Sequence, residues 1–112
     1  MASWEKSGEL TAAVERFADR LRAAPQSRLQ RGAAAEGLAL ARELAVRAQR
    51  AENPEREPLT MPDAGVFTVA DQLVVAGNDL AEILRTAPAD SREGDLGEAV
   101  RLVREAAERS GL

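Results

Sequence analysis

Two pairs of carboxylates in the C-terminal half have a spacing that could serve a metal ion. Asp79 and Glu82 lie three residues apart, and Asp95 and Glu98 repeat this spacing further along the chain. Mg²⁺ is held where several oxygen ligands converge on one point. Asp79 and Glu82, however, fall on the polar half of a predicted helix, and Asp95 occupies a predicted helix N-cap. The sequence therefore predicts that these carboxylates do not converge on an ion.

The same segments resemble a known family. DLAE at residues 79–82 and DLGE at residues 95–98 are similar to the paired acidic motifs of the all-α nucleotide pyrophosphohydrolases, which bind Mg²⁺ through carboxylates on neighbouring helices. The resemblance implies Mg²⁺-dependent nucleotide hydrolysis as an alternative function. It covers residues 79–98 alone, and this chain has Asp at two positions where the family has Glu.

Residue types that the chain lacks exclude most other chemistry. The sequence contains no Cys, no His and no Tyr. Disulfides, metal sites built from Cys and His, and catalysis by His or Cys are therefore excluded. Together with the diverging carboxylates, this predicts a protein that is not an enzyme. We expect no catalytic residue, no bound metal ion and no cofactor.

The charges are unevenly distributed along the chain. Residues 1–53 carry nine basic and seven acidic side chains, net +2, whereas residues 54–112 carry six and twelve, net −6. The total of −4 argues against a nucleic acid as the main partner. Halves of opposite sign are expected to attract each other within one molecule, and pairing between two copies is the alternative.

The N-terminus has no hydrophobic signal region, and no apolar run approaches the roughly 20 residues that span a bilayer. We therefore expect a cytoplasmic protein without a membrane segment. Lys6 is the only Lys, and the bias towards Arg and Ala is typical of actinobacterial coding.

Amphipathic segments appear when residues are placed at the helical step of about 100°. The first is predicted over residues 7–24, from an N-cap at Ser7 to Pro25. The second is predicted over residues 27–52, from an N-cap at Ser27, without an internal break. Few aromatic residues and much Ala favour closely spaced helices.

Residues 66–88 fit two structures. A β-hairpin would turn at Ala70 and Asp71, without the Gly or Asn that such turns prefer. A helix over residues 67–86, with Thr68 and Asp71 as a capping box, is favoured because its apolar residues fill one continuous half of the helical wheel. That apolar arc consists of Val69, Ala70, Leu73, Val74, Ala76, Gly77, Leu80, Ala81, Ile83 and Leu84.

The last helix is predicted over residues 95–109, with Asp95 and Glu98 as its capping box. Between the second and third helices, a proline at every fourth position predicts an extended connector over residues 53–65. The sequence therefore predicts a single all-α domain, residues 1–112. Its expected fold is a four-helix antiparallel bundle built from two helical hairpins joined by a Pro-rich connector. The connector prolines are Pro54, Pro58 and Pro62.

Particular residues are expected to matter for packing and association. Gly77, in the middle of an apolar arc, is predicted to pack closely against Gly37 and Ala41 of the second helix. Val75 and Leu102 lie on otherwise polar helix faces, which predicts that they form the interface of a homodimer. Trp4 is expected to fold back onto the core as an anchor.

The chain also contains a candidate internal repeat. LRAAPQS at residues 21–27 is similar to LRTAPAD at residues 84–90, sixty-three positions further on. Each copy would be a helix, an Ala-Pro turn and a second helix. The alternative is that two hairpins with a common stop signal arrived at this likeness independently.

These observations favour a small helical interaction or regulatory module without chemistry of its own. Its expected partner is another protein or a second copy of the chain. A helical bundle that binds a small-molecule ligand is the main alternative.

Overall fold

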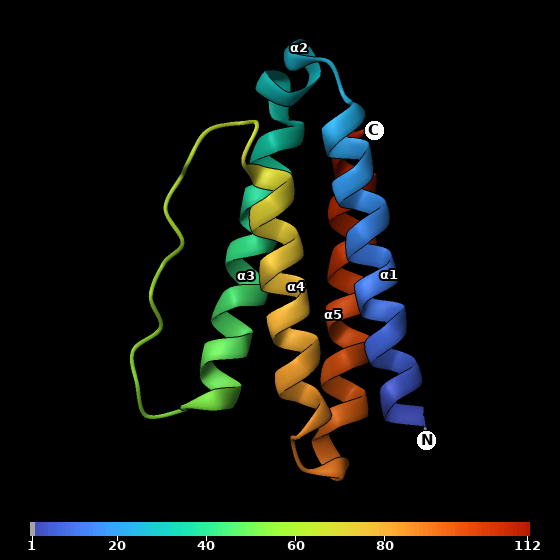
Figure 1. Ribbon diagram of the computed structural model, residues 1–112, viewed down its shortest axis with the longest axis vertical. Helices are drawn as coiled ribbons and strands as arrows, with labels where there is room; N and C mark the ends of the chain where they lie inside the picture. Colours follow the sequence, from blue (N-terminus) through green and yellow to red (C-terminus); the bar gives the residue numbers. More distant parts are fainter. Residues whose placement is uncertain (1) are drawn as a thin grey trace.

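A computed structural model describes the backbone of residues 2–112 and the side chains of residues 6–88 and 91–112. The described chain is all-helical and contains no strand, which confirms the predicted class. Four long helices pack in contact (Figure 1). The elements are α1 (Ala2–Ala23), α2 (Gln26–Arg28), the π-helical turn η1 (Leu29–Ala33), α3 (Ala34–Glu52), α4 (Val69–Arg85) and α5 (Ala89–Ser110).

Helix α4 settles the ambiguity of residues 66–88 in favour of a helix. Its apolar arc faces the core, where Leu73 and Leu80 are fully buried. Thr68 stands at the N-cap, but the capping box is wrong because the Thr68 hydroxyl donates to the carbonyl of Ala64 at 2.9 Å. The helix continues through Gly77, so the chain does not break there.

Three other helix starts differ from the prediction. Helix α1 begins at Ala2, so Ser7 is not a cap but a buried residue inside the helix. Helix α5 begins at Ala89, so Asp95 lies inside it. Ser27 does not cap either, since the helical segment starts at Gln26. The sequence does not predict the first turns of α1 and α5 because these turns are polar and carry no apolar stripe. The side chain of Trp4, the predicted anchor, lies outside the described residues.

Prolines begin the second helix of each half. The carbonyl of Pro25 accepts hydrogen bonds from the backbone N–H groups of Arg28 and Leu29, at 2.9 and 3.2 Å. The carbonyl of Pro88 does the same for Ser91 and Arg92, at 3.2 and 3.1 Å. A proline at such a position loses nothing, because the first N–H groups of a helix have no partner in it.

The predicted second helix is interrupted near its start. Gly32 has a φ of 154°, a region that favours glycine, within the π-helical turn η1. Residues 27–52 are therefore two helical pieces with a kink between them rather than one regular helix. The kink carries the chain from the end of α1 to the start of α3.

The path of the chain separates helices that are adjacent in sequence. Helix α1 runs upward in Figure 1, α3 runs downward, and the segment 53–68 returns along α3 to its upper end. Helix α4 then runs downward beside α3, and α5 runs upward beside α1. The main contacts are α3 with α4, α1 with α4, and α1 with α5, followed by α3 with α5. By contrast, α1 scarcely contacts α3, and α4 scarcely contacts α5.

This arrangement has an internal pseudo-twofold symmetry. If residue i is matched to residue i + 63, as in the candidate repeat, α1 corresponds to α4 and α3 corresponds to α5. The contact of α1 with α5 then corresponds to the contact of α4 with α3, and both are extensive. The symmetry agrees with the candidate repeat in the sequence. It also means that each half of the chain packs almost entirely against the other half.

The close approach at Gly77 exists, but its partner differs from the predicted one. A Cβ atom on Gly77 would lie 2.8 and 2.9 Å from the two γ-carbons of Val14, in α1. Gly37 instead faces Val69 and the end of Leu21. The nearest neighbour of Gly77 therefore lies on α1, whereas the predicted partners Gly37 and Ala41 lie on α3. Val14 and Gly77 are 63 positions apart, so α1 and α4 approach each other at the symmetry-equivalent residues.

Candidate functional site

The two carboxylate pairs lie in different parts of the molecule. Asp79 and Glu82 line a hollow between α3 and α4, together with Glu52. Asp95 lines a separate hollow, and Glu98 is hydrogen-bonded to Arg101 on its own helix. Among the described side chains, no group of three or more acidic residues is arranged to hold a metal ion. The arrangement that the pyrophosphohydrolase resemblance implies is therefore not formed by these four residues.

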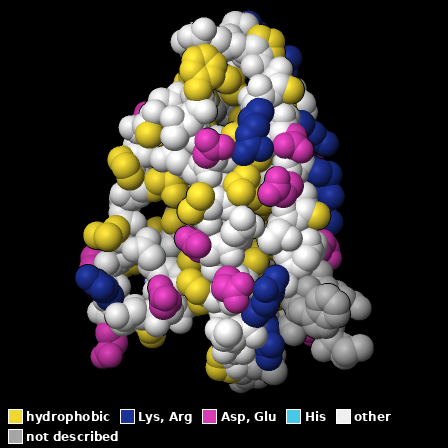
Figure 2. Space-filling model, in the orientation of Figure 1, with side chains coloured by type: hydrophobic (Ala, Val, Ile, Leu, Met, Phe, Trp, Pro, Cys, Tyr) yellow, Lys and Arg dark blue, Asp and Glu magenta, His cyan; other side chains and the backbone are white. Residues whose placement is uncertain are grey.

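Large apolar side chains are exposed on α4 and on the segment before it. Val75 is 59% exposed, and Phe67, just before α4, is 71% exposed. On the face shown in Figure 2, hydrophobic side chains are interspersed with acidic and basic ones. Asp71, Asn78 and Asp79 are exposed on the same helix as Val75. The outer surface of α4 therefore combines an apolar residue with negative charge.

Leu102 does not share this surface. It is half-buried and packs against the core, although the sequence predicts that it points away from it. It lies on α5, which scarcely contacts α4. A single interface containing both Val75 and Leu102, as predicted from the sequence, is therefore not supported. The helical wheel does not predict the contact of Leu102 with the core. It gives the direction of a side chain from its own helix axis but not the position of the neighbouring helices.

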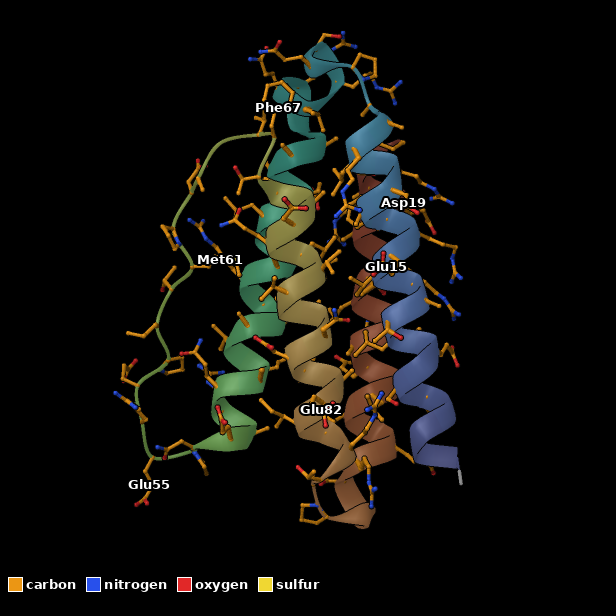
Figure 3. All side chains as sticks on the ribbon, in the orientation of Figure 1. Glu15, Asp19, Glu55, Met61, Phe67 and Glu82 are labelled. Atoms are coloured by element: carbon orange, nitrogen blue, oxygen red, sulfur yellow. The ribbon has the colours of Figure 1, made fainter. Side chains whose placement is uncertain are left out.

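The segment 53–68 is held against the helices by side chains that bind its backbone. The Gln49 amide donates to the Leu59 carbonyl at 3.0 Å and accepts from the Leu59 N–H at 2.8 Å. Arg42 donates to the Met61 carbonyl at 2.8 Å. Met61 lies midway along the segment, and Phe67 lies where it joins α4 (Figure 3). Leu59 itself is exposed, whereas Met61 and Val66 are half-buried and pack against the core.

A hollow of about 340 Å³ opens between α3, α4 and α5. Its volume falls in the range of small-molecule sites. Leu80 and Leu84 supply apolar surface, and Arg47 and Arg50 supply positive charge. Glu43 and Asp95 also line it, so the charges in the wall nearly balance.

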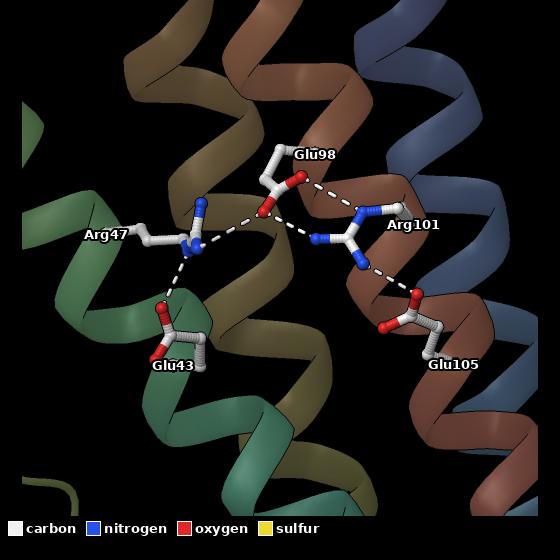
Figure 4. A network of polar contacts seen from close by, with 5 residues as sticks. All are labelled: Glu43, Arg47, Glu98, Arg101 and Glu105. Carbon is white, nitrogen blue, oxygen red and sulfur yellow. Dashed lines mark hydrogen bonds and ion pairs between the residues drawn. The ribbon is translucent and has the colours of Figure 1, made fainter.

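A chain of ion pairs crosses from α3 to α5 beside this hollow (Figure 4). Arg47 donates to Glu43 at 2.7 Å and lies 3.9 Å from Glu98 of α5. Arg101 lies 2.6 Å from Glu98 and 2.6 Å from Glu105. All of these side chains remain at least one-third exposed, so each contact contributes little to stability alone.

The network shifts the titration of its members. Hydrogen bonds from Arg101 lower the pKa of Glu98 below its ordinary value of 4.5, and the charges of Arg101 and Arg47 act in the same direction. Hydrogen bonds to Glu98 and Glu105 raise the pKa of Arg101. The shifts indicate a structural ion-pair network, since each charged form is stabilised by its neighbours. They do not produce a group that titrates near neutral pH.

Comparisons with known proteins return no relative: no family model, no curated protein and no solved structure matches this chain. Within residues 2–112, none of the helices has the length and apolar character that crossing a membrane requires. The cytoplasmic location stays a prediction.

The sequence analysis does not predict the exposure of Phe67 and Leu59, nor the hydrogen bonds of Gln49 to the backbone of Leu59. The predicted helix 67–86 includes Phe67, although a cap at Thr68, which the sequence also predicts, places Phe67 before the helix. No sequence pattern predicts the contacts of Gln49. A glutamine that binds the backbone of a distant residue can have the same neighbours in the sequence as an exposed glutamine.

Proposed function

We propose that this protein is a non-enzymatic helical interaction module that binds another protein through the outer surface of α4. Two antiparallel helical hairpins, joined by the Pro-rich connector, would form a four-helix bundle that presents this surface. The observation that carries the proposal is the exposure of Val75 and Phe67 on a surface with acidic side chains. Exposed apolar residues with a polar surround are typical of protein-interaction sites.

The charge of α4 defines the partner. Asp71, Asp79 and Glu82 are exposed on α4, but Asp71 is ion-paired with Arg22 of α1 at 2.9 Å and Glu82 with Arg85 at 3.2 Å, so Asp79 carries the negative charge that a partner would meet. Such a surface favours a partner that offers an apolar side chain surrounded by Lys or Arg, because opposite charges orient the encounter. A second copy that presents the same α4 surface would bring like charges together.

A matched pair of variants tests this function. Val75→Asp removes the exposed apolar side chain and adds one charge, whereas Asn78→Asp adds the same charge to exposed α4 surface without removing an apolar group. Both variants are used as bait in extracts of the native host. Proteins that bind the wild type and Asn78→Asp but not Val75→Asp are expected. Equal binding by all three baits would contradict a docking role for α4.

Self-association is measured on the same proteins. Light scattering across a concentration series gives the mass of each variant. A homodimer through α4 would dissociate in Val75→Asp and persist in Asn78→Asp. A mass that is independent of both substitutions would assign any self-association to another surface.

The hollow between α3, α4 and α5 favours a second candidate function, the binding of a small molecule. Leu80 and Leu84 suit an apolar group, and the balanced charges of the wall suit a ligand that carries both a positive and a negative group. Native mass spectrometry of protein purified from its host would detect such a ligand. Ala51→Trp, which fills the hollow, should abolish the added mass of the ligand. The control Ala12→Trp, at an exposed position of α1, should leave that added mass unchanged.

A further inference from the structure

The two halves of the chain meet in an unusual way. Residues 2–52 contain α1, α2, η1 and α3, and residues 69–110 contain α4 and α5. Within each half the two long helices scarcely contact each other, whereas the contacts between the halves are extensive. Each half alone would therefore leave its apolar surface exposed, and it needs the other half to bury it.

Polar contacts between the halves follow the same symmetry. Arg22 lies 2.9 Å from Asp71, and Arg85 donates to Ser7 at 3.3 Å. Arg22 and Arg85 are 63 positions apart, so equivalent arginines reach from the end of one helix to the start of the other. Across α3 and α5, Glu36 with Arg109 and Arg47 with Glu98 are again nearly equivalent contacts, at 3.0 and 3.9 Å.

Equivalent residues that face each other across a twofold axis are the hallmark of an interface between two copies of one unit. Here the two units are halves of one chain. The surface that residues 1–52 offer is complementary to residues 69–112, whichever copy of the chain supplies them. The covalent link between the halves decides which copy that is.

The connector, residues 53–68, joins the two halves and lies on the surface of the molecule. Residues 53–68 are mostly exposed, and hydrogen bonds from Arg42, Gln49 and Gln72 fix their backbone. Because α3 and α4 run in the same direction, the connector must return along the length of α3. The 19 residues of α3 span about 28 Å. Sixteen extended residues reach about 50 Å, which is also enough to cross to a neighbouring molecule.

We propose that the α4–α5 half of one copy docks onto the α1–α3 half of a second copy, so that two chains form a dimer by exchanging halves. This inference goes beyond the proposed function, because the exchange uses the faces by which the two halves pack and not the outer surface of α4. The connector gives a chain's own halves a high effective concentration, so the unlinked copy competes only in concentrated protein. Shortening the connector removes this advantage.

The first experiment shortens the connector. Deleting residues 55–65 leaves five connector residues, which reach about 17 Å and cannot return along α3. We expect this variant to be a helical dimer, or a larger closed assembly, by light scattering and circular dichroism. A well-folded monomer would overturn the proposal. A matched variant in which residues 55–65 are replaced by a flexible Gly-Ser sequence of equal length should stay a monomer when dilute.

The second experiment uses full-length chains and detects the exchange directly. One chain carries Arg22→Cys and another carries Asp71→Cys, which places the only cysteines at a contact between the halves. The two are unfolded and refolded together at high concentration, then treated with a short flexible bis-maleimide. Cross-linked chains are expected, and their absence after joint refolding would contradict the exchange.

Controls distinguish the exchange of halves from a dimer that forms through the outer surfaces of intact molecules. Chains refolded separately and then mixed should not cross-link, and Glu105→Cys in place of Asp71→Cys should not either, since Glu105 contacts Arg101 of its own helix. A dimer through the surface of α4 would give a dimeric mass without the cross-link and would be sensitive to Val75→Asp. That result would overturn the exchange and leave the proposed function standing.

Discussion

The α1–α4 contact and the α3–α5 contact join equivalent helices of the two halves in the same antiparallel sense, yet different interactions close them. At the first, Gly77 lets α4 approach Val14 so closely that a Cβ atom would have no room. At the second, charged side chains link the helices, and a hollow of about 340 Å³ lies beside them. Both contacts have ion pairs, but the first also has a close approach at its centre, whereas the second leaves a hollow beside it.

The difference shows how two similar halves can diverge. At the symmetry axis of α1 and α4, equivalent positions face each other, and two valines there would collide. Val14 opposite Gly77 resolves the conflict, because one residue fills the space that the other leaves. Exposed ion pairs need no such complementarity, so the α3–α5 contact tolerates more change.

The largest effect is expected for Gly77→Leu. The new side chain would be forced into Val14, which is buried and β-branched and so has little freedom to move. Overpacking of this kind costs about 1–3 kcal/mol or more. Thermal unfolding followed by circular dichroism should show a lower Tm. A Tm equal to that of the wild type would mean that α1 and α4 do not pack closely at this point.

Gly77→Ala tests whether Val14 is the obstacle. Its Cβ would lie under 3 Å from Val14, and the gain of about 1 kcal/mol in helix propensity only partly offsets this collision. We expect moderate destabilisation. In a double-mutant cycle with Val14→Ala, the combined loss should be smaller than the sum by at least about 0.5 kcal/mol. Additive losses would contradict the contact.

The sequence predicts burial better than it predicts neighbours. The apolar arc of α4 identified its buried residues, because an amphipathic pattern reports which face leaves water. The pattern says nothing about which helix covers that face, and so the partner of Gly77 was assigned to α3 rather than α1. The sixty-three-residue offset contained this information, since it places Val14 opposite Gly77 once a twofold axis is assumed.

For the candidate site, the sequence separated the two carboxylate pairs for a reason that holds only in part. Asp79 and Glu82 do lie on the exposed side of α4, as its polar arc indicates. Asp95 diverges because it lines a different hollow, not because it caps a helix. The exposure of Phe67 depends on the path of the connector, and the contact of Arg47 with Glu98 depends on the approach of α5 to α3. The ion pair of Arg47 with Glu43, by contrast, follows from their i,i+4 spacing.

A smaller effect is expected for Gly37→Ala, where the obstacle yields more easily. Its Cβ would lie 2.7 Å from a γ-carbon of Val69 and 3.0 Å from the end of Leu21. Val69 is the first residue of α4 and follows the exposed connector, and the Leu21 terminus can turn. Together with the gain in helix propensity, this predicts a net change within about 1 kcal/mol. A loss as large as that of Gly77→Leu would show that the α3–α4 contact is equally rigid.

The smallest effect is expected at the charged contact, and Glu98→Gln measures it. The substitution removes the carboxylate that Arg47 and Arg101 share, whereas the control Glu105→Gln removes one that contacts Arg101 within α5 alone. Glu98→Gln should lower the Tm slightly more than the control does, and the difference should shrink in 1 M salt because the side chains are exposed. Equal Tm values at low salt would show that the link across α3 and α5 contributes nothing.

Acid should remove the contribution of Glu98 in the wild type. Because its pKa is lower in the folded protein than the ordinary 4.5, the folded state binds fewer protons than the unfolded state near that pH. The stabilisation is therefore complete above the unfolded pKa and is lost as the pH falls through the folded pKa. The Tm of the wild type should fall more steeply than that of Glu98→Gln between about pH 5 and pH 3. Parallel curves for the two proteins would mean that the charged form of Glu98 is not stabilised by its arginines, and the α3–α5 contact would then rest on its buried side chains and on the ion pair of Glu36 with Arg109.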